Sequence, residues 1–291
     1  MKLLAVTLLA LVAISYAKHI NLEDVIDLEE ITAYGYHTKV GGPLAEKIRK
    51  AEEEATRNPT RTGPFPAILG QFPYQAGLII DLNGWSGVCG GALLNMRRIL
   101  TAAHCWFDGH NQASGIIVIL GTINLFSGGT RVISDSVFMH GSWNPNLARH
   151  DIAIINLPYA VFPSNTIGFV SLPAISDLQN SFTATIIGYG RTASGGMLYR
   201  DLHFAEVPVI TNSECQNSFP GLIQPSSICI SGASGISACT SDAGGPLVVN
   251  NNDSHILMGV HSFGHIQGCR SGHPVAYTRV TSYISWIVSR L

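Results

Sequence analysis

Short apolar stretches of strand length restrict what this chain can fold into more than any other feature of its sequence. The residues in them are continuously apolar or alternate with polar ones, and clusters of Gly, Pro, Asn and Ser separate one stretch from the next. The stretches cover residues 75–81, 88–94, 115–120, 151–157, 184–189, 247–249 and 255–261. Because no helical period lies between them, the pattern predicts an antiparallel β-sandwich or β-barrel.

The composition agrees with an all-β chain and excludes other classes of protein. Hydrophobic residues make up 46% of the 291 residues and charged residues only 12%, which excludes disorder and coiled coil for most of the chain. The formal net charge of −2 provides no overall positive field for nucleic acid. The length is sufficient for one large domain or for two barrels.

Residues 1–17 are predicted to be a signal peptide. Lys2 precedes an apolar run from Leu3 to Ile14, and Ser15 and Ala17 supply the small residues that signal peptidase requires. A membrane anchor is the alternative, but a helix that crosses a bilayer needs about 20 apolar residues, and this run is shorter. Secretion into an extracellular fluid is therefore expected.

Residues 18–61 differ from the rest of the chain because they are strongly charged and contain no cysteine. Pro43 begins a run of helix-forming residues that predicts a helix over 43–55, ended by Asn58-Pro59. The segment is either a solvated spacer or a pro-segment that precedes a folded domain over 62–291. A second, amphipathic helix is expected at about 281–290.

Six cysteines in a secreted chain imply disulfide bonds. The sequence alone permits 15 ways to pair them. No pair has the C-x-x-C spacing of a zinc or redox site, and the histidines form no ligand spacing, so no metal or cofactor is predicted. The sequon that starts at Asn252 is available for glycosylation in the secretory path.

The basic residues after Lys50 are all Arg. Arg stays charged above pH 10, where Lys begins to lose its proton. This bias predicts a protein that works in an alkaline fluid, such as a gut lumen, unless it reflects compositional drift alone.

Three short motifs place reactive residue types beside predicted strands. Residues 101–105 read TAAHC and contain His104, residues 151–153 read DIA and begin with Asp151, and residues 241–246 read SDAGGP. Covalent acyl transfer needs a base for the nucleophile, an acid group that orients the base, and backbone N–H groups that stabilise an oxyanion. The first two motifs supply the base and the acid group.

Together and in this order, the motifs resemble those of the chymotrypsin-fold, trypsin-like serine proteases over about residues 65–291. The resemblance implies two antiparallel six-stranded β-barrels, at about 72–160 and 170–280, with the active site in the cleft between them and a helix at the C-terminus. It also implies the disulfide bonds Cys89–Cys105, Cys215–Cys229 and Cys239–Cys269.

The resemblance assigns His104 as the general base and Asp151 as its orienting carboxylate, but the nucleophile position falls on Ala243. A methyl group has neither a lone pair nor a proton to give up, so acylation at this position is impossible. The backbone N–H groups of Ser241 and Ala243 match the oxyanion hole. Ser241 cannot readily replace the nucleophile, because it stands at the family's glycine and its side chain points elsewhere.

The activation sequence departs from the family as well. Members gain activity when a new Ile-Val-Gly-Gly terminus pairs with the aspartate before the nucleophile, here Asp242. The register places that terminus at Arg61 to Pro64, with Thr60 where a basic residue is expected. A laboratory Ser-to-Ala change would explain the first departure only, whereas a naturally inactive homologue explains both.

The specificity pocket of the family maps onto Ser237 at its base, residues 262–264 along its wall and Val275 at its rear. Ser237 carries no charge, so a preference for Lys or Arg is not expected. The wall, Ser262-Phe263-Gly264, resembles the family's Ser-Trp-Gly, which pairs with an extended peptide as a β-strand. Val275 stands where the family often has Gly, which predicts either a pocket for small apolar groups or a filled core.

These features predict a secreted serine protease homologue that lacks protease activity. It would bind protease inhibitors, peptide segments or an active protease, and neither nucleic acid nor membrane. The alternative is an active chymotrypsin-like endopeptidase with another nucleophile. A third possibility is a storage or structural protein.

Overall fold

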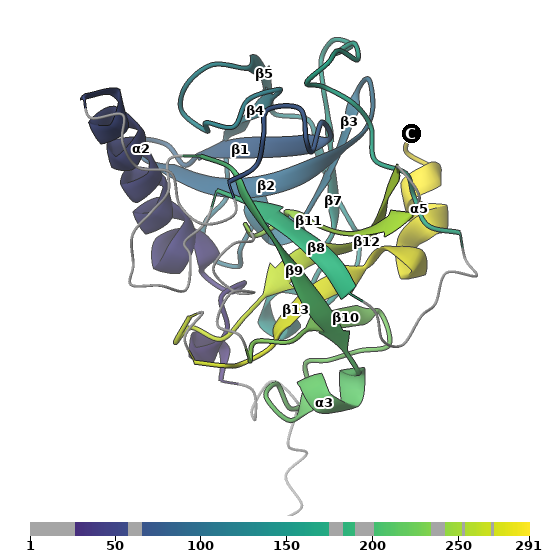
Figure 1. Ribbon diagram of the computed structural model, residues 1–291. Coiled ribbons are helices and arrows are strands. Elements are labelled where there is room, and N and C mark those ends of the chain that lie inside the picture. Colours follow the sequence, from purple (N-terminus) through teal and green to yellow (C-terminus); the bar gives the residue numbers. More distant parts are fainter. Residues whose placement is uncertain are drawn as a thin grey trace, which may run out of the picture.

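Antiparallel strands form two packed sheets in the computed structural model of the chain (Figure 1). The structure describes residues 27–57, 66–174, 183–189, 201–233, 242–251, 254–268 and 271–291. The first sheet contains the strands up to residue 156, and the second contains the strands from residue 183 onward. The chain therefore builds one sheet after the other.

The N-terminal sheet has seven strands in the order β5-β4-β1-β2-β3-β7-β6. The strands are β1 (Gln75–Asp81), β2 (Ser86–Asn95), β3 (Arg98–Thr101), β4 (Gly115–Leu120), β5 (Thr130–Ser134), β6 (Val137–Met139) and β7 (Ala153–Asn156). β1 is buried along six of its seven residues because β2 and β4 pair with it on both sides. Between its end residues Gln75 and Asp81 the sequence is apolar throughout, which is typical of such a central strand.

The C-terminal strands close into a six-stranded barrel in the order β10-β13-β12-β11-β8-β9. They are β8 (Thr183–Gly188), β9 (His203–Ile210), β10 (Ser227–Ile230), β11 (Pro246–Asn251), β12 (Ser254–Phe263) and β13 (Val275–Arg279). Alternate residues of β9 are buried, because one face of each strand points into the barrel. Val275 and Tyr277 belong to the apolar cluster that fills it.

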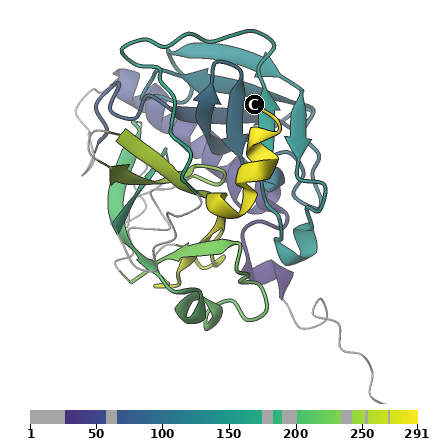
Figure 2. The ribbon, with the colours of Figure 1, turned by 90° about the vertical axis from the view of Figure 1, so that its right-hand side faces the viewer.

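Three α-helices lie outside the sheets in the part of the chain that the structure describes: α2 (Gly42–Arg57), α3 (Asn212–Gln216) and α5 (Ile284–Val288). α2 lies along the flank of the N-terminal sheet, and α5 lies near the C-terminus (Figures 1 and 2). α3 begins with a capping box, since the Thr211 hydroxyl accepts from the Glu214 N–H and the Glu214 carboxylate accepts from the Thr211 N–H. Short turns of other helix types are η2 (Leu28–Glu30), η3 (His37–Gly41), η4 (Ala103–Cys105), η5 (Pro145–Leu147) and η6 (Val280–Tyr283).

The predicted all-β fold with a C-terminal helix is confirmed, and its second barrel has the expected six strands. The first differs in detail: it is a seven-stranded half-barrel whose end strands are β5 and β6. The sheet has one strand more than expected, because residues 137–139 form the edge strand β6, which pairs with β7. Among the residues that the structure describes, no helix is both long and apolar enough to cross a membrane.

Residues 27–57 pack against the sheets, which differs from what a solvated spacer would do. Ala45 and Ile48 of α2 are buried in the same apolar cluster as the N-terminal sheet. The predicted signal peptide, residues 18–26 and residues 58–61 lie outside the described residues. Whether residues 18–61 are removed as a pro-segment stays a prediction.

Candidate active site

His104 and Asp151 meet at one end of the N-terminal sheet because of the way β3 and β7 pair. Thr101 in β3 lies opposite Ala153 in β7. His104 follows Thr101 by three residues and Asp151 precedes Ala153 by two. Since neighbouring antiparallel strands run in opposite directions, both side chains reach the same edge.

The imidazole of His104 and the carboxylate of Asp151 form a fully buried pair. His104 Nδ1 lies 2.7 Å from Asp151 Oδ2, and the backbone N–H of His104 donates to Oδ1 at 2.9 Å. Both side chains are 0% exposed. Because a carboxylate accepts, Nδ1 carries the proton and Nε2 is left as the basic nitrogen.

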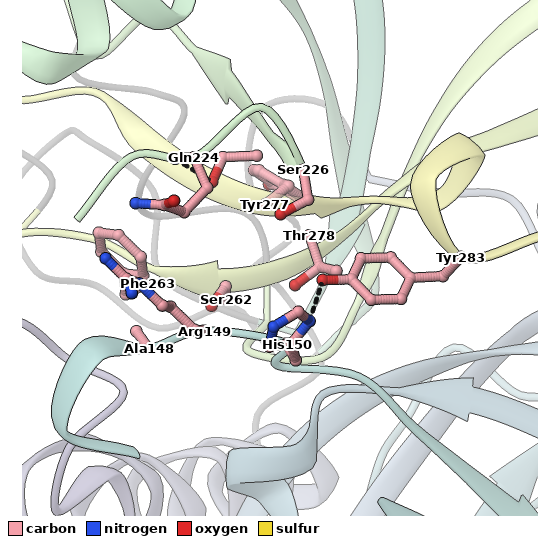
Figure 3. Close-up of a pocket in the computed structure, with 11 residues that line it drawn as sticks. Ala148, Arg149, His150, Gln224, Ser226, Ser262, Phe263, Tyr277, Thr278 and Tyr283 are labelled. Atoms are coloured by element: carbon pink, nitrogen blue, oxygen red, sulfur yellow. Dashed lines mark hydrogen bonds between the residues drawn. The ribbon is translucent and has the colours of Figure 1, made fainter. Parts of the chain in front are cut away.

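Two hydroxyls of the C-terminal barrel hold Asp151 in place from the other side. Ser262 Oγ donates to Asp151 Oδ2 at 2.6 Å, and Thr278 Oγ1 donates to the Asp151 carbonyl at 2.7 Å. These residues lie on the wall of a small polar cavity, of about 10 Å³, that Figure 3 shows. On another side of it, Tyr283 contacts His150 Nδ1 at 2.9 Å (Figure 3). The cavity has room for about one water molecule, so it supports Asp151 and does not take a substrate.

Ala243 lies in the turn that leads into β11, and this turn is bound to the N-terminal sheet. The Ala243 carbonyl accepts from the Gly90 N–H at 2.8 Å, and Thr101 Oγ1 donates to the Gly90 carbonyl at 2.8 Å. Gly244 has φ +77°, and a Cβ on it would lie 2.7 Å from the Gly90 oxygen, so only glycine fits there. The turn before β11 is therefore held against β2 of the N-terminal sheet.

The nucleophile hydroxyl is absent from this arrangement. Ala243 is 6% exposed and presents only its methyl group. His104 Nε2 is buried and has no hydrogen-bond partner among the described residues. The site therefore has an oriented base with no hydroxyl on Ala243 for it to deprotonate.

Asp242 is buried beside the same turn. One carboxylate oxygen accepts from the Tyr189 N–H at 2.7 Å, and the other has no partner among the described residues. Burial raises the pKa of Asp242 to about 7, and the hydrogen bond from Tyr189 opposes this rise only in part. Arg61 to Pro64, where the resemblance expects the activating terminus, lie outside the described residues.

The predicted specificity pocket is described only in part. Ser262 and Phe263 are buried at the end of β12. Val275 is 1% exposed, and one of its methyl groups faces Gly264, since a Cβ on that glycine would lie 3.7 Å away. Other predicted site residues lie outside the described residues, namely Ser237, Cys239, Ser241 and Cys269, as does Asn252 of the sequon.

Two disulfide bonds are present, Cys89–Cys105 and Cys215–Cys229. They are the pairs that the resemblance implies within the described residues. Cys89 and Cys105 also lie close to His104. Because their sulfurs are bonded to each other, they offer no thiolate to a metal ion.

Two residues that the sequence analysis did not assign to the site cover it. The ring of Tyr36 packs edge-on against His104, with the centroids 4.8 Å apart, and its hydroxyl donates to the Val88 carbonyl at 2.8 Å. The ring of His37 is fully buried, and its Nε2 donates to the Cys105 carbonyl at 3.1 Å. Burial lowers the pKa of His37 to about 4. The one sequence signal was the cluster Tyr34 to His37 within a charged segment.

The comparisons with known proteins agree with this geometry. The chain matches the Trypsin family over residues 62–287. It is 38% identical over 228 residues to a collagenase of Hypoderma lineatum, an alignment that covers 77% of this chain and 84% of that protein. It is 37% identical over 231 residues to Trypsin I-P1 of Gallus gallus, covering 77% and 86%. A solved structure of HL collagenase superposes with a TM-score of 0.70 and 35% identity, over 77% of this chain and 96% of that one. The chain thus belongs to the trypsin-like, chymotrypsin-fold serine protease family.

Proposed function

We propose that this protein is a serine protease homologue that does not cleave peptides and acts by binding them. The observation that carries the proposal is Ala243 at the position that the resemblance assigns to the nucleophile. Its carbonyl lies 3.7 Å from the sulfur of Cys105, the residue after His104, and His104 is oriented by Asp151. Without a hydroxyl at this position, no acyl-enzyme can form. In subtilisin, an unrelated protease, loss of the serine lowers kcat by about a millionfold.

The rest of the cleft supports a role in binding. The wall formed by Ser262, Phe263 and Gly264 is present, and Ser262 is hydrogen-bonded to Asp151. Because two relatives are named a collagenase and a trypsin, a polypeptide is the ligand class that we propose. The partner would be a peptide segment, a protease inhibitor or an active protease, as for a decoy or cofactor.

The altered activation sequence and the predicted secretion also support the proposal. Arg61 stands where an activating Ile is expected, and an Arg side chain in an apolar activation pocket carries a burial cost. Two independent departures favour a natural inactive homologue over a single laboratory substitution. The predicted signal peptide, supported by the two disulfide bonds, points to an extracellular protein.

A fluorophosphonate probe tests this proposal on the full chain, because it labels only an activated serine. We expect no label on the purified protein under conditions in which an active trypsin is labelled fully. A label on the protein would reject the proposal and favour the rival, an active endopeptidase with another nucleophile.

The Ala243→Ser variant separates the two departures. If it is labelled, the missing hydroxyl alone accounts for the inactivity, and if it is not, a second block also operates. The matched control is Ala160→Ser, the same change at a partly exposed position far from the motifs, which should stay unlabelled.

A further inference from the structure

A segment of the chain itself already pairs with the wall of the cleft through an isolated β-bridge between Ile31 and His265. We call residues 30–37 the cleft segment. The Thr32 N–H donates to the Gly264 carbonyl at 3.1 Å, and the Ile266 N–H donates to the Glu30 carbonyl at 2.7 Å. The Gly264 N–H is also satisfied, since it donates to Thr32 Oγ1 at 3.0 Å. The cleft segment thus makes the antiparallel pairing that an extended peptide is expected to make on this wall.

Two side chains of the cleft segment enter an apolar site next to the wall. Ile31 is 2% exposed and Ala33 is 0% exposed. Both belong to one apolar cluster with Phe219 and Phe263, whose rings pack edge to face 5.2 Å apart. Ile31 forms an isolated antiparallel bridge with His265, and the bend that follows at residues 32–33 leaves Thr32 partly exposed and Ala33 buried.

The cleft segment then crosses the catalytic position. Tyr36 lies against His104, as described above, and its hydroxyl is bound to the N-terminal sheet. The next residue, His37, donates its backbone N–H to Asp108 Oδ2 at 2.9 Å. The segment therefore bridges both sheets and covers His104 on the way.

The helix that follows anchors the cleft segment. Ile48 of α2 is fully buried. The Glu52 carboxylate accepts from the Phe126 N–H and from Ser127 Oγ, both at 2.9 Å. α2 runs along the flank of the N-terminal sheet (Figure 1), so the segment is fixed at its end as well as along the wall.

We infer that the cleft segment is an internal ligand of the peptide cleft. The partner which replaces it is a peptide that pairs with the wall at the Ile31 site and then turns, as the cleft segment does at residues 34–35. It has a branched aliphatic residue at the Ile31 site and an aromatic residue five positions later, at the Tyr36 site. The inference rests on the proposed function, because it specifies the ligand of a cleft that binds and does not cut. A tethered ligand acts at an effective concentration of about millimolar. A free peptide at micromolar concentration is therefore excluded until the segment leaves.

The test is peptide exchange on the full chain, followed by fluorescence anisotropy. The probe is a labelled synthetic peptide with the sequence of residues 28–38, LEEITAYGYHT. The opened variant carries Ile31→Asn and Tyr36→Ala, and the matched control carries Lys47→Asn on the exposed face of α2. We expect the opened variant to bind the probe about 100-fold more tightly than the wild type or the control, which should not bind it at micromolar concentration.

A second variant guards against loss of the fold. Thr32→Pro removes both the N–H that donates to the Gly264 carbonyl and the hydroxyl that accepts from the Gly264 N–H, and it should also bind the probe more tightly than the wild type. Equal binding by the wild type and both variants would overturn the inference, as would a failure of both variants to bind while their circular dichroism remains native. A probe with Asn in place of its Ile should not bind either variant, and equal binding of this probe would also overturn it. The fluorophosphonate result decides the proposed function separately, since it does not depend on peptide exchange.

Discussion

The two sides of the proposed cleft differ in the reactive groups that they supply. On the side of the N-terminal sheet, His104 and Asp151 make each hydrogen bond that orients a general base. Ser262 donates to the carboxylate of Asp151 and Thr278 donates to its backbone carbonyl. On the side of the turn before β11, the Ala243 carbonyl is bound to Gly90, and Ala243 supplies no hydroxyl. The difference is one oxygen atom.

This contrast teaches that strand pairing places the groups and that single atoms perform the chemistry. The register of β3 against β7 brings His104 to Asp151 whatever stands at position 243. The buried polar pair also contributes to folding, because buried donors left without acceptors are costly. A site that has lost its reaction, as we propose for this one, can therefore keep its geometry.

The largest expected effect is a loss of folding stability when the His104–Asp151 pair is broken. Asp151→Ala should lower the free energy of unfolding by about 3–5 kcal/mol, because it leaves several buried donors around His104 without their acceptor. Urea denaturation measures this change. The control, Asp135→Ala, alters an exposed carboxylate and should change stability by about 0.5 kcal/mol or less. Equal effects at both positions would mean that the buried pair does not support the fold.

The second effect concerns pH and the cleft segment that covers both sides. Burial lowers the pKa of docked His37, and His104 lowers it to a smaller degree. Asp108 and the Cys105 carbonyl act to raise the pKa of His37. The net pKa of His37 is about 4, against 6.5 for a free histidine. Protonation therefore favours release of the segment. We expect the equilibrium constant for docking of the cleft segment to be at its full value above pH 6.5. It should fall by roughly tenfold per pH unit between pH 6.5 and about pH 4.

Amide hydrogen exchange at Thr32 and Ile266 measures this release. We expect faster exchange at pH 5 than the intrinsic rate change explains, and a smaller increase in His37→Gln, which keeps a donor for Cys105 but does not titrate. The same pH response in His37→Gln would remove His37 from the account.

The smallest expected effect is a gain in stability when a hydroxyl is added at position 243. Ala243→Ser should raise the free energy of unfolding by about 1 kcal/mol, since the new hydroxyl can donate to His104 Nε2, which now has no partner among the described residues. Urea denaturation beside Ala160→Ser checks it. A loss of stability would show that the turn does not direct position 243 toward His104.

Much of the fold follows from local patterns in the sequence. The apolar stretches at 75–81 and 115–120 coincide with β1 and β4, and α2 contains the helix expected over 43–55. β9 was not predicted, because Glu206 and Pro208 interrupt its apolar run. Its alternate residues are buried in the barrel, and this packing stabilises it as a strand. The C-terminal helix is shorter than expected, since Val280–Tyr283 form a 3-10 turn ahead of α5.

The covering of the site could not be predicted, because its contacts join residues far apart in the chain. Tyr36 and Val88 are 52 residues apart, and Thr32 and Gly264 are 232 residues apart. The charged composition of residues 18–61 allowed a solvated spacer, since a buried segment as short as Ile31 to Ala33 leaves almost no periodic signal.

Hydrolysis of a chromogenic peptide by the purified full chain tests the central claim most directly. We expect no release of chromophore above that of the peptide alone, with or without prior treatment by an irreversible organophosphate. Steady hydrolysis that the organophosphate abolishes would contradict the account, because it would require a reactive serine in a site where position 243 offers only a methyl group.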